Sequence, residues 1–391
     1  MNNDRFIRIT CIFLILKKMP SYQRYIRQLS LPEIGRKGQE KLGNVSVLVV
    51  GAGGLGCPAL LYLAAAGIGR IGIIDGDVVE LSNLHRQVLY TEDDAGKLKT
   101  EAAVLKLSKL NSLTGVTAYP YWLNRDNAME IIGEYDIIID GTDNLPTRYL
   151  INDACVLLGK PFVYGSIYRF EGQVSLFNNG NSDGTRGPNY RDLFPEPPPA
   201  ALVPGCQEAG VIGVLPGIIG TMQATEAIKW ATGMNGLLNG ALLIFDAIEY
   251  EARKVIIQPR EDNPVSGRNP SIARLIDYEH FCNSQPQHGV SEITPEELKT
   301  WIDSGQEQIL IDVRTAEEHE FFNIGGIHVE PHDIESIANT LHRETRAIFY
   351  CRTGRRSAEA IKRLKEIGTG GEMYNLRGGI EAWRRNIPLI R

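Results

Sequence analysis

The sequence has no long apolar segment, few cysteines and little excess charge of either sign. Its apolar N-terminal run, Ile9 to Leu16, has eight residues, far fewer than the roughly 20 that a membrane-spanning helix needs. A net charge of −6 over 391 residues offers no basic surface to nucleic acid or to an anionic membrane. The six cysteines lack the spacing of a disulfide framework, which suits a reducing compartment. We therefore expect a cytoplasmic protein that binds neither nucleic acid nor a membrane.

A chain of 391 residues is long enough for two domains, each with its own core. We expect an N-terminal extension over residues 1–19, with Met19 as the preferred start, because no small-residue cleavage site follows the apolar run. A first domain is expected over residues 20–260. A polar, proline-containing linker follows over 261–290, and a second domain occupies 291–391.

A glycine-rich turn stands between two apolar, β-branched segments near the start of the first domain. Val45–Val50 predicts a buried strand, Pro58–Ala66 a helix, and Arg70–Ile74 a second strand that ends at Asp75. The glycines of the turn are Gly51, Gly53, Gly54 and Gly56. Such a βαβ unit brings backbone amides to a phosphate and an acid to a ribose. The unit predicts a nucleotide site, and by itself it suggests a dinucleotide such as NAD.

Residues further along the chain favour a different nucleotide. Asp143 follows the predicted strand Asp136–Asp140, and the carboxyl ends of parallel strands share one ligand-binding edge. Arg86 and Lys99 add two cations at the same edge. Two cations and an acid suited to Mg²⁺ match a nucleoside triphosphate better than a dinucleotide. ATP and Mg²⁺ are therefore the expected ligands, and an NAD-dependent oxidoreductase is disfavoured.

The second domain has a cysteine in a setting that favours reactivity. Cys351 ends the predicted strand Arg346–Tyr350 and opens a short loop before a helix. The loop residues are Cys351, Arg352, Thr353, Gly354, Arg355 and Arg356. Backbone amides and the three arginines are expected to stabilise a thiolate that attacks sulfur or phosphorus. Cys57 and Cys155, on apolar helical faces, are expected to be core residues.

Both halves resemble known families. Residues 20–260 resemble the MoeB/ThiF family through RYIRQ (24–28), GAGGLG (51–56), DGDVVELSNLHRQ (75–87), GKLK (96–99) and GTDN (141–144). Residues 291–391 resemble a rhodanese domain through LIDVRTAEEHE (310–320), CRTGRRS (351–357) and NLRGGIEAW (375–383). The resemblance implies an α/β protein: a Rossmann-like, doubly wound adenylation domain followed by a smaller α/β rhodanese domain. This pairing is similar to the molybdopterin-synthase sulfurylase type.

The resemblance implies a two-step activity. ATP adenylates the C-terminal glycine of a ubiquitin-like sulfur-carrier protein ending in Gly-Gly, and a persulfide on Cys351 then gives a thiocarboxylate. The persulfide would come from a donor such as a cysteine desulfurase or thiosulfate. The residues implied at the nucleotide are Gly51, Gly53, Gly54, Gly56, Asp75, Ser82, Asn83, Leu84, His85, Arg86, Lys99, Asp143, which would ligate Mg²⁺, and Asn144.

Two further residues have roles implied by the same resemblance. Arg27 acts from the partner subunit in this family, which implies a homodimer. Cys206 stands where some relatives form a thioester or an acyl disulfide with the carrier. The alternative is activation of a ubiquitin-like modifier without sulfur transfer, the rhodanese domain serving as a docking module. The receiving pathway stays open among molybdenum cofactor, thiamine, tRNA and cysteine synthesis.

The chain departs from the family at a structural zinc site. The family commonly holds zinc with two C-x-x-C pairs, and this chain has Asn189 and Asp192 in the first pair and Asn263 and Ser266 in the second. Amide, carboxylate and hydroxyl groups cannot rebuild a tetrahedral thiolate site. We therefore expect no zinc, and we expect the long loop 178–205 to lose its anchor.

Overall fold

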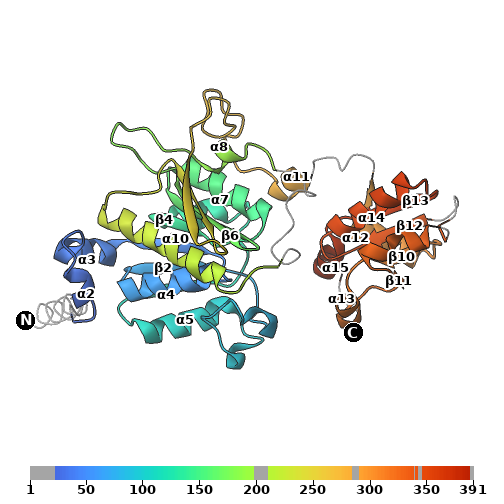
Figure 1. Cartoon of the computed structure of the whole chain (residues 1–391), viewed down its shortest axis with the longest axis horizontal. Helices are drawn as coiled ribbons and strands as arrows, with labels where there is room; N and C mark the ends of the chain where they lie inside the picture. The colour runs from blue at the N-terminus through green and yellow to red at the C-terminus, as the bar shows by residue number, and fades with distance from the viewer. Residues whose placement is uncertain (1–22, 198–209, 284–289, 339, 342–345, 388–391) are drawn as a thin grey trace, which may run out of the picture. The chain divides into compact units, whose positions relative to one another are not determined.

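The computed structural model describes residues 23–197, 210–283, 290–338, 340–341 and 346–387. The chain divides into two compact units, one reaching Cys282 and one starting at Asn283 (Figure 1). The expected extension over residues 1–19 and the predicted site residue Cys206 lie outside the described residues. No helix in the described ranges is both long and apolar enough to cross a membrane.

An eight-stranded sheet forms the centre of the first unit, in the order β3-β2-β1-β4-β5-β6-β7-β8. Its strands are β1 (Ser46–Val50), β2 (Arg70–Ile74), β3 (Gly115–Tyr119), β4 (Ile137–Asp140), β5 (Phe162–Tyr168), β6 (Glu171–Phe177), β7 (Ala241–Asp246) and β8 (Glu251–Ile256). The strands from β3 to β5 pair in parallel, and the remaining pairs are antiparallel. The strand order reverses at β1, so the carboxyl ends of β1, β2 and β4 form the edge where such sheets bind ligands.

Helices cover both faces of this sheet (Figure 1). They are α2 (Ile26–Leu29), α3 (Gly35–Asn44), α4 (Gly56–Ala66), α5 (Lys99–Leu110), α6 (Ala128–Gly133), α7 (Leu145–Leu158), α8 (Tyr190–Leu193), α10 (Leu215–Thr232) and α11 (Tyr278–Asn283), with 3₁₀ turns η1 (Leu81–Asn83) and η2 (Glu92–Asp94). Alternate residues of β1 enter opposite cores: Val47 and Val49 pack with α4, α5 and α10, whereas Leu48 and Val50 pack with α6 and α7. This is the predicted doubly wound arrangement, and it explains why β1 is apolar throughout.

The second unit has a five-stranded, all-parallel sheet in the order β11-β10-β12-β13-β9. Its elements are β9 (Ser291–Ile293), α12 (Pro295–Asp303), β10 (Ile309–Asp312), α13 (Ala316–Phe321), β11 (Ile327–His328), η4 (Pro331–Ile337), β12 (Arg346–Tyr350), α14 (Arg355–Glu366), β13 (Glu372–Leu376) and α15 (Gly379–Asn386). A capping box starts α12, where Thr294 Oγ1 accepts from the Glu297 amide at 3.2 Å.

The segment expected to be a linker is folded onto the first unit as far as Cys282. Asn263, Val265 and Tyr278 are all buried. Tyr278 also donates its hydroxyl hydrogen to the Asp153 carboxylate of α7 at 2.8 Å. Residues 261–282 therefore add to the core of the first unit and do not simply join the two units.

The expectation that loop 178–205 loses its anchor is wrong for its described part, residues 178–197. The Arg191 side chain, fully buried in α8, makes two hydrogen bonds to Asp153 of α7 at 2.7 and 2.8 Å. The side-chain amide of Asn178 donates to the carbonyls of Cys155 and Lys160. A buried charge is stable only when it is paired in this way, so these contacts hold the segment against α7.

Candidate active site

The glycine turn between β1 and α4 is closely packed against the end of β4. Gly51 has a φ of +91°, and a β-carbon there would lie 2.8 Å from the Gly141 carbonyl oxygen. A β-carbon at Gly56 would lie 1.9 Å from the carbonyl oxygen of Gly51. Both positions therefore require glycine. In the described chain the amides of Gly53 and Gly54 have no hydrogen-bond partner, so they are free to bind an anion next to the start of α4.

Asp75, at the end of β2, braces this turn. One carboxylate oxygen accepts from the Ala52 amide at 2.7 Å and the other from the Asp77 amide at 2.8 Å. Burial raises the pKa of Asp75, while the positive charge of Lys99 acts in the opposite direction. Asp75, the predicted acceptor for a ribose hydroxyl, is thus hydrogen-bonded into the wall of the site.

Lys99 begins α5, and its ammonium points to the same edge. Its Nζ lies 2.9 Å from Asp77 Oδ2, and the lysine side chain is 6% exposed against 54% for that of Asp77. Sequence reasoning did not single out Asp77. The signal available was its position two residues beyond the predicted strand-ending Asp75. Because the carboxylate partner of this buried lysine is exposed, another anion can replace that carboxylate as the partner of the lysine.

Arg86 lies over the glycine turn. A β-carbon at Gly54 would be 3.6 Å from Cγ of Arg86. The guanidinium donates to the Ser82 carbonyl at 3.2 Å, and the His85 ring approaches the same oxygen at 3.0 Å. The Asn83 side chain lies 3.3 Å from the Ser82 hydroxyl. The structure therefore brings the 82–86 segment together with the glycine turn, as the sequence predicts.

Two further residues of this stretch, Leu84 and Gln87, are turned toward the protein interior. Leu84 packs against the hydrophobic core. Gln87, which sequence reasoning missed, is 3% exposed, and its Oε1 has no partner within the described residues. A β-carbon at Gly53 would lie 3.7 Å from Gln87 Nε2. Because buried polar atoms normally have partners, Gln87 is a residue to add to the candidate site.

The end of β4 presents an acid and a cap. Asp143 is exposed, and the described residues provide no hydrogen bond or ion pair to its side chain. Asn144 accepts from the Thr147 amide at 2.9 Å and so caps α7. Arg148 fixes the loop after β4 through hydrogen bonds to Asp140 at 3.3 Å and to the Thr142 carbonyl at 2.9 Å.

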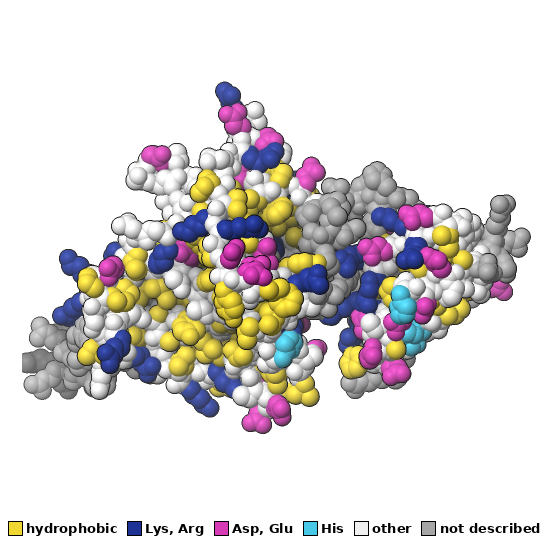
Figure 2. Space-filling model, viewed as in Figure 1, with side chains coloured by type: hydrophobic (Ala, Val, Ile, Leu, Met, Phe, Trp, Pro, Cys, Tyr) yellow, Lys and Arg dark blue, Asp and Glu magenta, His cyan; other side chains and the backbone are white. Residues whose placement is uncertain are grey.

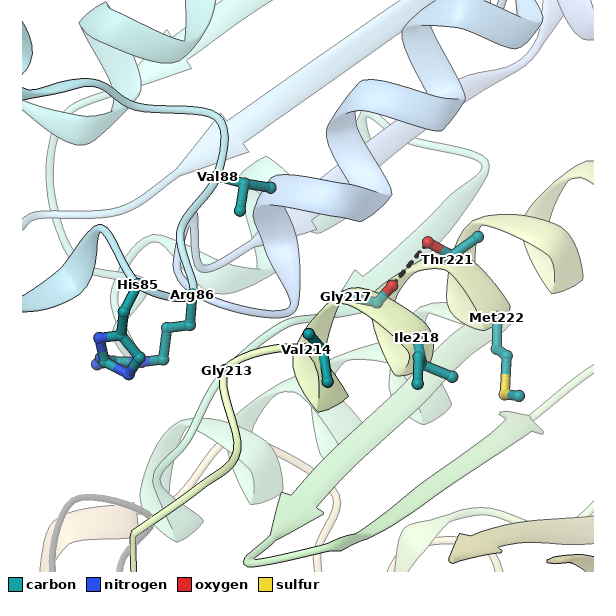
Figure 3. Close-up of a pocket in the computed structure, with 9 residues that line it drawn as sticks. All are labelled: His85, Arg86, Val88, Gly213, Val214, Gly217, Ile218, Thr221 and Met222. Atoms are coloured by element: carbon teal, nitrogen blue, oxygen red, sulfur yellow. Dashed lines mark hydrogen bonds between the residues drawn. The ribbon is translucent and has the colours of Figure 1, made fainter. Parts of the chain in front are cut away.

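An apolar pocket of about 580 Å³ adjoins Arg86 (Figure 3). Its walls are the 85–88 segment and the first turns of α10, where Thr221 donates to the Gly217 carbonyl. The lining residues are His85, Arg86, Val88, Gly213, Val214, Gly217, Ile218, Thr221 and Met222. Val88 and Val214 are both more than 60% exposed, and Figure 2 shows other hydrophobic side chains gathered on the visible face of this unit.

Arg27 is exposed on α2, and within the described chain it has no recorded hydrogen bond or ion pair. Its neighbour Arg24 donates to the Leu110 carbonyl at 2.9 Å. Arg24, which precedes α2, is therefore tied to the end of α5, whereas Arg27 projects from the surface.

In the second unit, Cys351 lies at the end of β12 with its side chain fully buried. Its sulfur accepts from the Gly354 amide at 3.1 Å, and the Ser357 hydroxyl lies 3.5 Å away. Gly354, with a φ of +95°, is the residue from which α14 starts. The sulfur therefore faces the amino end of a 12-residue helix, where a negative charge is stabilised.

Two arginines of this loop, Arg352 and Arg356, are paired with carboxylates. Arg356 makes two hydrogen bonds of 2.7 Å to Glu318, and Arg352 bonds to Glu381 at 2.5 Å. Each of these two charges is paired with a carboxylate, so they add little net positive potential at Cys351. The sulfur is thus contacted by the Gly354 amide, and the two arginines link the loop to Glu318 and Glu381.

The core positions predicted for two cysteines are confirmed. Cys57 and Cys155 are fully buried. Burial raises the pKa of Cys57 to about 12 and that of Cys155 well above its usual value. Both thiols stay protonated at neutral pH and are therefore poor nucleophiles.

Together these features define an α/β nucleotide-binding domain followed by a unit that presents a cradled thiol. Family comparison agrees: the ThiF family matches residues 25–266 and the rhodanese-like domain matches residues 294–386. The chain belongs to the ThiF family and carries a C-terminal rhodanese-like domain.

Several curated proteins share this arrangement. The chain is 46% identical over 374 residues to a probable adenylyltransferase/sulfurtransferase MoeZ of Mycobacterium tuberculosis, covering 93% of each chain. It is 52% identical over 259 residues to a sulfur carrier protein adenylyltransferase of Thermus thermophilus, covering 66% of this chain and 96% of that one. It is 42% identical to an adenylyltransferase and sulfurtransferase MOCS3 of Culex quinquefasciatus, covering 93% and 87%.

Among solved structures, the chain resembles that of Escherichia coli MccB bound to a MccA variant. The TM-score is 0.55 at 23% identity, with 64% of this chain and 76% of that chain covered. This likeness supports the fold of the first unit.

Proposed function

We propose that this chain uses ATP to adenylate the C-terminal glycine of a ubiquitin-like sulfur carrier, and then transfers sulfur to that carbon from a persulfide on Cys351. The observation that carries the proposal is the pairing, in one chain, of an anion-binding glycine turn under Arg86 with a thiol cradled at the amino end of α14. Both features lie in a chain whose relatives are named adenylyltransferases and sulfurtransferases.

In the first step, the free amides of Gly53 and Gly54 and the cations of Arg86 and Lys99 receive the phosphates of ATP. Lys99 exchanges its pairing with Asp77 for a phosphate oxygen. The carrier's carboxylate attacks the α-phosphorus, and pyrophosphate leaves with the electron pair of the broken P–O bond. Fixed positive groups stabilise the charge that develops. The apolar pocket beside Arg86 offers the carrier's C-terminal residues a place next to these phosphates.

Asp143 is the proposed Mg²⁺ ligand. It is exposed, follows a parallel strand and has no partner within the described residues. Mg²⁺ is usually held by one or two carboxylates together with substrate phosphates and water, so a single free carboxylate fits the ion. The bound ion would supply charge neutralisation on the phosphates.

We propose a homodimer in which Arg27 serves the partner's site. The support is an exposed arginine that is tied to nothing in the described part of its own chain. The test mixes Arg27→Ala chains, which keep their own Lys99, with Lys99→Met chains, which keep Arg27. Mixed dimers regain activity in one of their two sites if Arg27 acts across the interface. Mixing without any recovery would show that Arg27 acts within its own chain or not at all.

In the second step, the outer sulfur of the Cys351 persulfide attacks the acyl carbon, and AMP leaves with the electron pair of the C–O bond. The product is an acyl disulfide that joins the carrier to Cys351. A second thiol attacks the Cys351 sulfur and forms a disulfide with it, which releases the carrier thiocarboxylate. That thiol is an external one, and a further external thiol reduces the resulting disulfide. Cys206 is the candidate residue for a thioester or an acyl disulfide with the carrier. A cysteine desulfurase or thiosulfate is the proposed source of the persulfide.

ATP–pyrophosphate exchange tests the first step. Exchange should require a carrier with a free C-terminal glycine and should vanish when that glycine is removed. Exchange that proceeds equally with the truncated carrier would contradict the proposal. Exchange with an intact carrier, but with no thiocarboxylate formed by a persulfide-loaded chain, would instead support modifier activation without sulfur transfer.

A further inference from the structure

The four residues at the family's zinc-ligand positions lie together and hydrogen-bond to one another. Asn189 donates its side-chain amide to the Ser266 hydroxyl at 2.8 Å. Asn263 donates to Asp192 Oδ1 at 2.8 Å and to Asn189 Oδ1 at 3.3 Å. Each asparagine thus reaches the last residue of the opposite pair. We call these four residues the polar clasp.

Each half of the clasp is also a closed turn. Asn189 Oδ1 accepts from the Arg191 amide at 3.0 Å, and Asn263 Oδ1 accepts from the amides of Val265 and Ser266 at 3.0 and 3.1 Å. An asparagine that bonds the amide two residues ahead is the usual way in which its side chain fixes a turn. The two turns, 74 residues apart at their asparagines, are held face to face by hydrogen bonds that their side chains make.

The only charged member of the clasp is fully occupied. Asp192 Oδ1 accepts from the Asn263 amide and from the Arg260 backbone, the latter at 2.8 Å, and Oδ2 accepts from the Asn189 backbone at 2.7 Å. The amide nitrogens that meet inside the clasp carry hydrogens and cannot ligate a metal. Zinc prefers thiolate and imidazole ligands, so this donor set does not fit the zinc of the family.

We propose that the polar clasp replaces the structural zinc, so that this chain closes the same junction by hydrogen bonds and without metal. The clasp joins α8 and its N-cap residue to the segment that leads into α11. Asn189 and Asn263 are each 1% exposed. Their bonds are therefore shielded from water, and the loss of one leaves buried polar groups without partners.

The first test measures metal and stability on the purified full chain. Elemental analysis should find far less than one zinc per chain, and the melting temperature should be the same with and without a strong chelator. One tightly held zinc per chain, with a melting temperature that falls on chelation, would overturn the proposal.

The second test uses two variants in the same segment. Asp192→Asn keeps the shape of the side chain but replaces one carboxylate oxygen with an NH2 group, which cannot accept hydrogen bonds from the backbone N–H groups that face it. We therefore expect the melting temperature to fall by roughly 5 °C or more. Asp262→Asn is the matched control, because Asp262 is an exposed acid whose ion-pair partner among the described residues is the nearby Arg260 side chain. Equal effects of the two changes would contradict the proposal.

The third test restores the metal ligands. The variant Asn189→Cys, Asp192→Cys, Asn263→Cys, Ser266→Cys should take up one zinc per chain and become sensitive to chelation, because the four positions already converge. A variant that folds and binds no zinc would show that the clasp does not occupy the place of the metal.

Discussion

Ser357 donates its only hydroxyl hydrogen to Asn375 Oδ1 at 2.6 Å, although the same hydroxyl lies 3.5 Å from the sulfur of Cys351. Both residues are at most 1% exposed. One hydrogen cannot serve two acceptors, and the shorter bond takes it. The Ser357–Asn375 bond is therefore the stronger of the two, and the contact of the hydroxyl with the Cys351 sulfur is the weaker.

The first prediction is that Asn375→Ala makes Cys351 more reactive. Without the Asn375 acceptor, Ser357 turns its hydrogen to the sulfur and stabilises the thiolate. Because a hydrogen bond stabilises a charged acceptor, we expect the alkylation rate of Cys351 at neutral pH to rise on the order of 10-fold in this variant. Rates measured with iodoacetamide across a pH series check this. The double variant Asn375→Ala, Ser357→Ala should lose the gain, and a gain that survives without Ser357 would refute the explanation.

The second prediction separates the two activities. Cys351→Ala should abolish thiocarboxylate formation and leave ATP–pyrophosphate exchange within about two-fold of the original, since the thiol is not part of the nucleotide site. Cys282→Ser is the control, because burial raises the pKa of that thiol to about 12 and keeps it protonated. Thiocarboxylate formed at the normal rate by the Cys351 variant would exclude the persulfide route.

The third prediction concerns the cation of α5. Lys99→Met should lower the rate of pyrophosphate exchange by about 10²–10³-fold, the usual cost of removing one preorganised charge from a transition state. Lys97→Met removes a nearby lysine that pairs with Asp94 and should change the rate little. If both variants exchange at the same rate, Lys99 does not contact the phosphates.

The fourth prediction is a pH dependence of the second unit. Burial raises the pKa of Asp312, but hydrogen bonds from Arg314 and His319 outweigh it, so the pKa is lower than usual. The ionised Asp312 carboxylate therefore contributes its full stabilisation above the ordinary pKa of aspartate, and this contribution is lost as the pH falls through the lowered pKa.

Thermal melts of Asp312→Asn and of the unsubstituted chain between pH 7 and pH 3 check this sign. The difference in melting temperature should be largest near neutrality and should shrink below about pH 4. Asp303→Asn, at an exposed acid paired with Lys299, is the control. A difference that does not change with pH would contradict the assignment.

The sequence predicts the parts of the fold that repeat a local pattern. Each buried parallel strand is a short apolar run, and Lys99 opens its helix where the periodicity begins. β8, Glu251–Ile256, is exposed along its whole length, and its sequence has no apolar alternation from which a strand could be predicted.

The sequence likewise predicts only part of each candidate site. Sequence motifs identify the glycine turn, Arg86, Asp143 and Cys351, because their chemistry depends on residues close together in the chain. They do not reveal which charges are neutralised by distant partners. The Glu318 partner of Arg356 lies 38 residues away, and the polar clasp joins segments 71 to 77 residues apart. Such pairings of polar residues carry no periodic signal, and only the folded chain shows them.

The most direct test of the account follows one sulfur atom. Cys351 is loaded with radioactive persulfide sulfur, the free donor is removed, and a carrier with an intact C-terminal glycine is added with or without ATP. The label should move to the carrier's C-terminus only when ATP is present. Label that stays on Cys351 while pyrophosphate exchange proceeds would contradict the central claim that one chain both activates the carrier and supplies its sulfur.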